Sequence, residues 1–145
     1  VDDPEYKEEC VQLIEMLGVK DIIFTGPVNV VEYMEKFDFT ILTSISEGQP
    51  LSVLESFAAA RPAVTTDVGC CRELIYGRTQ DELGQAGFLV PPMHREELAN
   101  AMERMCLDTE MRNKMGAIAQ KRVERYYTHE ISMNQYRELY KEVIM

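Results

Sequence analysis

The chain has no tryptophan, few basic residues and only two histidines among its 145 residues. Its 15 lysines and arginines are outnumbered by 25 aspartates and glutamates, which gives a formal net charge of −10. Nucleic acids and anionic membrane surfaces repel a domain of this charge. We therefore expect no nucleic-acid partner, although a local positive field such as a helix N-terminus can still hold a small anion.

Long apolar runs are also missing. No stretch approaches the ~20 consecutive apolar residues that a membrane-spanning helix requires, and residues 1–5 are acidic and polar, unlike a signal peptide. Hydrophobic residues make up 46% of the chain, which is ordinary for a globular protein and too high for a disordered one. We expect one domain over residues 1–145, without a direct membrane span and located in the cytoplasm.

Cysteine is scarce and forms no Cys-x-x-Cys pair, which is typical of reduced thiols in a cytosolic protein. Two of the cysteines, Cys10 and Cys106, are expected on apolar helix faces, and the other two, Cys70 and Cys71, are adjacent. His94 and His129 stand at expected helix starts, far from any cysteine cluster. We therefore predict no metal site.

The most informative stretch covers residues 39–60. An apolar run predicts a buried strand over 39–44, and a polar turn follows it. Pro50 occupies what would be a first helical position, where its missing N–H costs nothing, and a helix-forming run continues to Ala60. Such a strand–loop–helix junction presents free backbone N–H groups and the positive end of a helix dipole, which suits a phosphate.

Two carboxylates flank this junction. Glu47 lies in the loop, and Glu55 lies beyond Pro50 by about 7.5 Å of helix axis. A diphosphate at the helix start and a ribose farther along would fit this span, with Glu55 accepting hydrogen bonds from the ribose hydroxyls. Glu47 lies near the diphosphate, so its charge needs a sugar hydroxyl as partner. Gly48 lets the backbone approach a ligand closely.

Strand and helix patterns alternate along the chain, which predicts a parallel α/β sheet with right-handed crossovers. The expected strands are 21–25, 39–44, 62–66 and 87–90. The expected helices are 4–17, 30–36, 50–60, 72–76 and three amphipathic helices after Pro91-Pro92. The polar stretch 77–85 is expected to be an exposed connection.

An ordered set of motifs links these elements to a known family. Residues 46–55 spell Ser-Glu-Gly-x-Pro-Leu-x-x-Leu-Glu, which contains Glu-x7-Glu. The segments 24–26, 39–44, 61–69 and 86–92 fall where that family places strands and loops. On these motifs the chain resembles the retaining glycosyltransferases of family 4, which have the GT-B fold. Residues 67–75 are most similar to the branch of Pel-type exopolysaccharide synthesis.

The resemblance implies a binding site for a nucleotide-sugar donor, with a UDP-sugar favoured, and neither a cofactor nor a metal ion. Glu47 would be the catalytic-site carboxylate that holds the hydroxyls of the donor sugar, and Glu55 would bind the ribose. Val28 would lie in the loop that contacts the nucleotide base. The alternative is that this loop is a plain turn without a ligand contact. The diphosphate would be supported by the backbone of Gly48, Gln49, Pro50 and Leu51. The nitrogen of Pro50 takes no part, because it carries no hydrogen to donate.

By comparison with the family, the sequence starts in mid-fold, as the C-terminal, donor-binding half of a GT-B enzyme that lacks its first two strands. The expected fold is an incomplete Rossmann-like parallel sheet of about four strands flanked by helices, with a helical C-terminal third. The N-terminal domain that binds the sugar or glycan acceptor is expected to be missing. Three alternatives remain open for the missing strands. Strands 21–25 and 39–44 become neighbours, or the exposed sheet edges pair with another chain and allow oligomerisation, or the sequence is only part of a longer chain.

We expect the intact parent to transfer a sugar with retention in polysaccharide or glycoconjugate synthesis, and the isolated chain to be inactive. Two alternatives remain open: an epimerase or phosphorylase of GT-B architecture, and a catalytically silent nucleotide-binding or interaction domain. Without the surrounding motifs, Glu47 and Glu55 would be interpreted as a capping carboxylate and a solvated helix residue. Arg72 and Glu73 could form a local salt bridge or contact a substrate.

Overall fold

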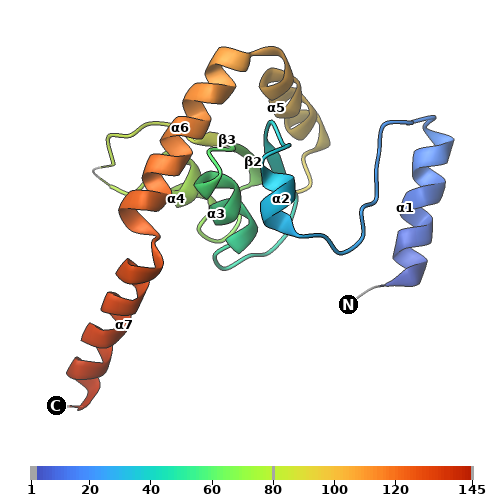
Figure 1. Ribbon diagram of the computed structural model, residues 1–145. Helices are drawn as coiled ribbons and strands as arrows, with labels where there is room; N and C mark the ends of the chain where they lie inside the picture. Colours follow the sequence, from blue (N-terminus) through green and yellow to red (C-terminus); the bar gives the residue numbers. More distant parts are fainter. Residues whose placement is uncertain (1–2, 80, 145) are drawn as a thin grey trace.

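The computed structural model describes residues 3–79 and 81–144 of the chain. Helices and strands alternate through its middle, and helices alone form its last third (Figure 1). The helices are α1 (Pro4–Met16), α2 (Val30–Met34), α3 (Leu51–Ala58), α4 (Cys71–Tyr76), α5 (Arg95–Leu107), α6 (Thr109–Tyr126) and α7 (His129–Ile144). The strands are β1 (Thr40–Leu42), β2 (Ala63–Thr66) and β3 (Gly87–Val90).

The sheet is parallel, with the strand order β1-β2-β3. In register, Ile41 of β1 lies opposite Val64 of β2, and Val64 lies opposite Phe88 of β3. All three carboxyl ends therefore meet at one edge of the sheet, where open α/β sheets bind ligands. The predicted α/β class, with a parallel sheet flanked by helices and a helical last third, is confirmed.

The central strand β2 is buried along its whole length, and its side chains alternate between two layers of core. Ala63 packs in one layer with Phe57 of α3 and Leu74 of α4. Val64 packs in the other layer with Phe88 of β3 and with residues of α5 and α6. These two layers hold α3 and α4 on one face of the sheet and α5 on the other, so the loops at the carboxyl edge are anchored from both faces.

Helix α6 is attached to this core by a buried charge. Arg122 is 1% exposed, and its Nε donates to Asp81 Oδ2 at 2.8 Å. Its remaining nitrogens donate to the carbonyl oxygens of Leu74, Ile75 and Gly84. A buried arginine needs a counter-ion and an acceptor for each of its N–H donors. Asp81 supplies the counter-ion, and the Gly84 carbonyl is one of the acceptors. Arg78, Thr79 and Glu82 are exposed, as expected for the connection 77–85, whereas the Asp81 side chain is buried in its pair with Arg122.

The predicted strand at 21–25 does not form, so the sheet has three strands in the described residues instead of about four. This segment follows α1 as an extended connection (Figure 1). Ile23 is 85% exposed and Phe24 57% exposed. A strand forms only when a neighbour satisfies its backbone groups, and here no described strand lies beside it. The expected pairing of 21–25 with 39–44 was therefore wrong for the described residues.

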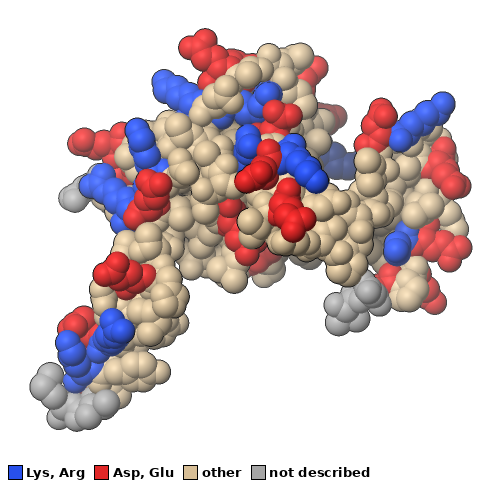
Figure 2. Space-filling model, viewed as in Figure 1, with Lys and Arg blue, Asp and Glu red and all other residues tan. Residues whose placement is uncertain are grey.

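Smaller differences concern helix ends and one cysteine. Helix α2 ends at Met34 and not at Lys36, and Pro50 is the N-cap of α3 instead of its first helical residue. Cys106 is exposed, so its predicted place on an apolar face is wrong, whereas Cys10 is half-buried. None of the described helices combines the length and the apolarity needed to cross a membrane. On the face shown in Figure 2, basic side chains stand among acidic ones.

Candidate functional site

The loop between β1 and α3 carries the first of the two predicted carboxylates. Glu47 is half-buried, and its Oε1 accepts a hydrogen bond of 2.7 Å from the Ser44 hydroxyl. In the described part of the chain, no lysine, arginine or histidine lies within 4.0 Å of this carboxylate. Glu47 therefore keeps acceptor capacity for the hydroxyls of a ligand.

The neighbouring loop, between β2 and α4, holds the Glu47 loop in place. The Thr66 hydroxyl donates to the Ser44 carbonyl oxygen at 2.6 Å, and the Cys70 amide donates to the Gly48 carbonyl oxygen at 3.0 Å. Between these bonds, Gly69 has φ +52° and touches the backbone of Glu47. A Cβ at Gly69 would lie 2.2 Å from the Glu47 carbonyl oxygen, a distance that excludes any side chain. The two loops thus form one packed unit.

The N-terminus of α3 lies directly after Glu47. Its N-cap, Pro50, makes no side-chain capping hydrogen bond, and the first amides of a helix have no partner within the helix. Gly48, Gln49 and Leu51 are exposed, whereas Pro50 is buried. Exposed, uncapped amides at a positive helix end can bind an anion.

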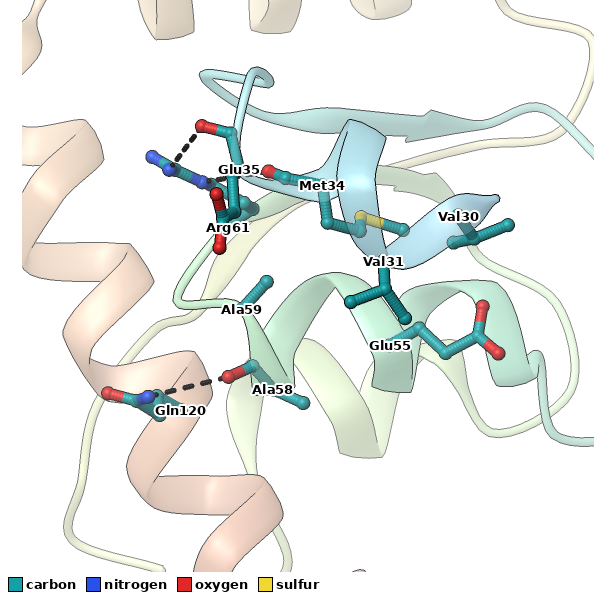
Figure 3. Close-up of a pocket in the computed structure, with 9 residues that line it drawn as sticks. All are labelled: Val30, Val31, Met34, Glu35, Glu55, Ala58, Ala59, Arg61 and Gln120. Carbon is teal, nitrogen blue, oxygen red and sulfur yellow. Dashed lines mark hydrogen bonds between the residues drawn. The ribbon is translucent and has the colours of Figure 1, made fainter. Parts of the chain in front are cut away.

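The second carboxylate, Glu55, is the fifth residue of α3 and is exposed. It borders a pocket of about 480 Å³ between α2 and α3, which Figure 3 shows with Glu55 lying close to Val30 and Val31. Farther along the pocket, Arg61 donates to the carbonyl oxygens of Met34 and Glu35, and Gln120 donates to the Ala58 carbonyl oxygen. The pocket therefore has an apolar wall beside Glu55 and polar side chains at its far end.

Val28 is 38% exposed and lies in the loop before α2. It is not among the residues that line the Glu55 pocket, whereas Val30 and Val31 are. Asn29 fixes this segment by accepting from the Val31 amide and donating to Glu32. The two valines of α2 were not predicted to border this pocket, although their adjacency to Val28 was a signal that could have identified them.

A second polar cluster lies beside the Gly69–Cys70 turn. Arg72 pairs with Asp67, and Arg78 Nε donates to Glu73 Oε1 at 2.5 Å. The Tyr127 hydroxyl donates to the same oxygen at 2.6 Å. Burial and the adjacent Glu73 charge raise the pKa of Tyr127. Both members of the Arg72-Glu73 pair therefore form local salt bridges, but with Asp67 and Arg78 instead of with each other.

The two histidines lie outside the loop unit. His94 is the N-cap of α5, with its Nδ1 3.6 Å from Glu97 Oε1, and His129 is the first residue of α7. No group of three or more histidine, cysteine, aspartate or glutamate side chains that could hold a metal ion occurs among the residues that the structure describes.

Known proteins resemble the chain in sequence and in structure. The chain is 28% identical over 145 residues to N-acetyl-alpha-D-glucosaminyl L-malate synthase of Bacillus anthracis. This match covers 99% of the chain and 36% of that protein. Sucrose-phosphate synthase from Thermosynechococcus elongatus superposes with a TM-score of 0.84 at 22% identity, over 99% of the chain and 37% of that enzyme. The HepE protein of Anabaena in complex with UDP-glucose superposes with a TM-score of 0.80 at 23% identity, over 96% and 38%.

The chain thus spans somewhat more than a third of the length of these proteins. Its three-stranded parallel sheet and covering helices correspond to part of the GT-B fold that the solved structures share. Residues 2–108, which include β1, β2, β3 and both carboxylates, match the family of glycosyl transferases group 1. On the match of these residues, the chain belongs to the glycosyl transferases group 1.

Proposed function

We propose that the chain forms the donor site of a glycosyltransferase that takes its sugar from a UDP-sugar and transfers it with retention of configuration. The observation that carries this proposal is the position of Glu47 and Glu55 on either side of the uncapped N-terminus of α3. Leu51 and Glu55 are separated by about 6 Å of helix axis. That spacing accommodates a phosphate at the amides of the helix start and a ribose beside Glu55.

Each part of the ligand then meets a group that suits it. The diphosphate lies at the exposed amides of Gly48, Gln49 and Leu51, where the helix dipole favours negative charge. Glu55 accepts hydrogen bonds from the ribose hydroxyls, and Glu47 accepts from hydroxyls of the donor sugar. A carboxylate would repel a phosphate, which is why both acids are assigned to hydroxyl groups.

The base is assigned to the segment that contains Val28, Val30 and Val31. Val30 and Val31 line the pocket beside Glu55 (Figure 3), so a base attached to the ribose would rest on apolar side chains. Binding of UDP-glucose by the structurally similar HepE supports uridine as the base. The backbone groups around Val28 are then available for the polar edge of the base.

In the transfer step, negative charge develops on the departing diphosphate. Backbone amides already aimed at this position stabilise that charge without reorganisation. Glu47 contributes by fixing the orientation of the donor sugar. The acceptor is bound by residues beyond this chain, so we expect no sugar transfer by the 145 residues alone. The resemblance of residues 67–75 to the Pel-type branch supports a role in polysaccharide or glycoconjugate synthesis.

Isothermal titration of UDP, GDP and ADP into the 145-residue chain tests the donor site. We expect UDP to bind most tightly, and Glu55→Ala to weaken it at least about tenfold, because hydrogen bonds to a charged group are lost. Glu103→Ala, an exposed change on α5, is the matched control and should leave the affinity unchanged. Equal affinities for the wild type and Glu55→Ala would contradict the ribose assignment. No nucleotide binding by the folded chain would contradict the proposal that these residues suffice for the donor site.

A further inference from the structure

We propose that Ser44 is a positioning residue for Glu47, and that Thr66 in turn fixes Ser44 to the central strand of the sheet. The inference rests on the proposed function, because it assigns a task to residues around the Glu47 carboxylate. Neither Ser44 nor Thr66 needs to touch the donor for this task. Both act by setting where one carboxylate oxygen of Glu47 lies.

The contacts form a continuous path from the core to the carboxylate. Thr66, the last residue of β2, is 4% exposed, and its hydroxyl donates to the Ser44 carbonyl oxygen at 2.6 Å. The Ser44 hydroxyl donates to Glu47 Oε1 at 2.7 Å. A hydrogen bond to a charged acceptor is stronger than one between neutral groups. Glu47 is therefore oriented from β2, the strand that is buried along its whole length.

The same path leaves the other carboxylate oxygen free. Ser44 satisfies only Oε1, and a carboxylate has two oxygens with several acceptor positions. With no cation within 4.0 Å of Glu47 among the described residues, Oε2 has capacity for a hydroxyl of the ligand. A carboxylate held at one oxygen and open at the other is preorganised, so binding a sugar does not require the side chain to be ordered first.

The Ser44 bond restrains the Glu47 side chain, whereas other contacts fix the backbone of the loop. The backbone of the loop is already fixed independently, since the Cys70 amide bonds to Gly48 and the backbone of Gly69 touches that of Glu47. The Ser44 hydroxyl adds a restraint on the side chain alone. Removing this hydroxyl should therefore weaken the binding of the sugar and leave the binding of the nucleotide nearly unchanged.

The test compares UDP with UDP-glucose by isothermal titration for the wild type, Ser44→Ala, Ser44→Thr and the control Glu103→Ala, an exposed change on α5. We expect the wild type to bind UDP-glucose more tightly than UDP. Ser44→Ala should lose most of this preference while its UDP affinity changes less than about twofold. Ser44→Thr, which keeps the hydroxyl, should restore the preference. Equal weakening of UDP and UDP-glucose in Ser44→Ala would overturn the positioning role.

A ligand-free measurement separates this inference from the proposed function. Side-chain scalar couplings of Glu47 by NMR should report a single rotamer in the wild type and rotamer averaging in Ser44→Ala and Thr66→Val. Averaged couplings already in the wild type would overturn the inference whatever the ligand results are. If the couplings behave as expected but the wild type does not prefer UDP-glucose to UDP, the positioning stands and the assignment of Glu47 to the sugar is wrong.

Discussion

The backbone of Gly69 packs against the carbonyl group of Glu47, so closely that a Cβ on Gly69 would stand 2.2 Å from the carbonyl oxygen. The same Cβ would stand 2.5 Å from the Gly48 carbonyl oxygen. Both neighbours are backbone atoms, so neither can move aside by rotating a side chain. The β2–α4 loop can therefore support the Glu47 loop only if residue 69 is glycine.

We predict that Gly69→Ala lowers the free energy of unfolding by at least about 1–2 kcal/mol, the cost of a left-handed conformation for a residue with a Cβ. The clash adds to that cost by forcing the two loops apart. Urea denaturation followed by circular dichroism measures the change. Gly48→Ala is the control, because no atom lies within 4 Å of its Cβ position. Equal stability of Gly69→Ala and Gly48→Ala would contradict the packing described here.

The two carboxylates should be separable by ligand. We predict that Glu47→Gln weakens UDP-glucose binding but leaves UDP binding within about twofold, because the nucleotide does not contact this side chain. Glu55→Ala should weaken both ligands to the same extent. Titration calorimetry of both variants with both ligands provides the measurement. A loss of UDP affinity in Glu47→Gln would show that this carboxylate acts on the nucleotide or on the loop as a whole.

The buried pair of Arg122 and Asp81 predicts a large loss of stability on single substitution. Arg122→Met removes the partner of a buried carboxylate and takes one donor away from each of three carbonyl groups, of which Ile75 keeps the Ala86 amide. We expect a decrease of about 3–5 kcal/mol in the free energy of unfolding. Lys121→Ala, an exposed change one residue earlier, should have little effect. A decrease below about 1 kcal/mol in Arg122→Met would argue against the buried pair.

The same pair predicts how stability depends on pH. Burial alone would raise the pKa of Asp81. The hydrogen bonds from Arg122 and from the Leu83 amide outweigh this effect of burial and hold the pKa below its usual value. A carboxyl group with a depressed folded-state pKa stabilises the fold above its unfolded pKa, about 3.9 for aspartate, and loses this contribution as the pH falls through the folded value.

We therefore expect the stability difference between the wild type and Asp81→Asn to be largest near neutral pH and to shrink in acid below about pH 4. Urea denaturation of both proteins at neutral and acidic pH measures this difference. Asp38→Asn serves as control, because Asp38 is 72% exposed in its pair with Arg112. A constant difference between wild type and Asp81→Asn over this range would rule out the titration of Asp81 as its cause.

Much of the fold could be predicted from local sequence, because β1, β2, β3 and the helices after Pro92 have the periodicity or apolar runs of their elements. The stretch 21–25 has the same apolar character as β1, yet forms no strand. A strand depends on its neighbours, and periodicity contains no information on whether a neighbour is present. Pro50 shows the usual uncertainty of one residue at a helix start.

The contacts that hold the two predicted carboxylates and the core in place were not predicted. Glu47 and Glu55 could be identified from the Glu-x7-Glu spacing, since both ends of the pattern lie around one helix start. The contact of Thr66 with Ser44 joins residues 22 apart, and that of Arg122 with Asp81 joins residues 41 apart. Arginine is rarely buried, so no local pattern indicated Arg122 as a core residue.

The central position of β2 also determines how the molecule opens. Its amides bond to strands on both sides and its faces are covered by two layers of core, so they can exchange hydrogen with solvent only when the whole sheet comes apart. Helix α1, in contrast, contains no buried residue and can unfold without disturbing the sheet. Because Thr66 belongs to β2 and the Glu47 loop is bonded to it, we expect the Glu47 part of the candidate site to persist through local unfolding of α1. The Glu55 part, in contrast, depends on α3 and is lost whenever that helix opens.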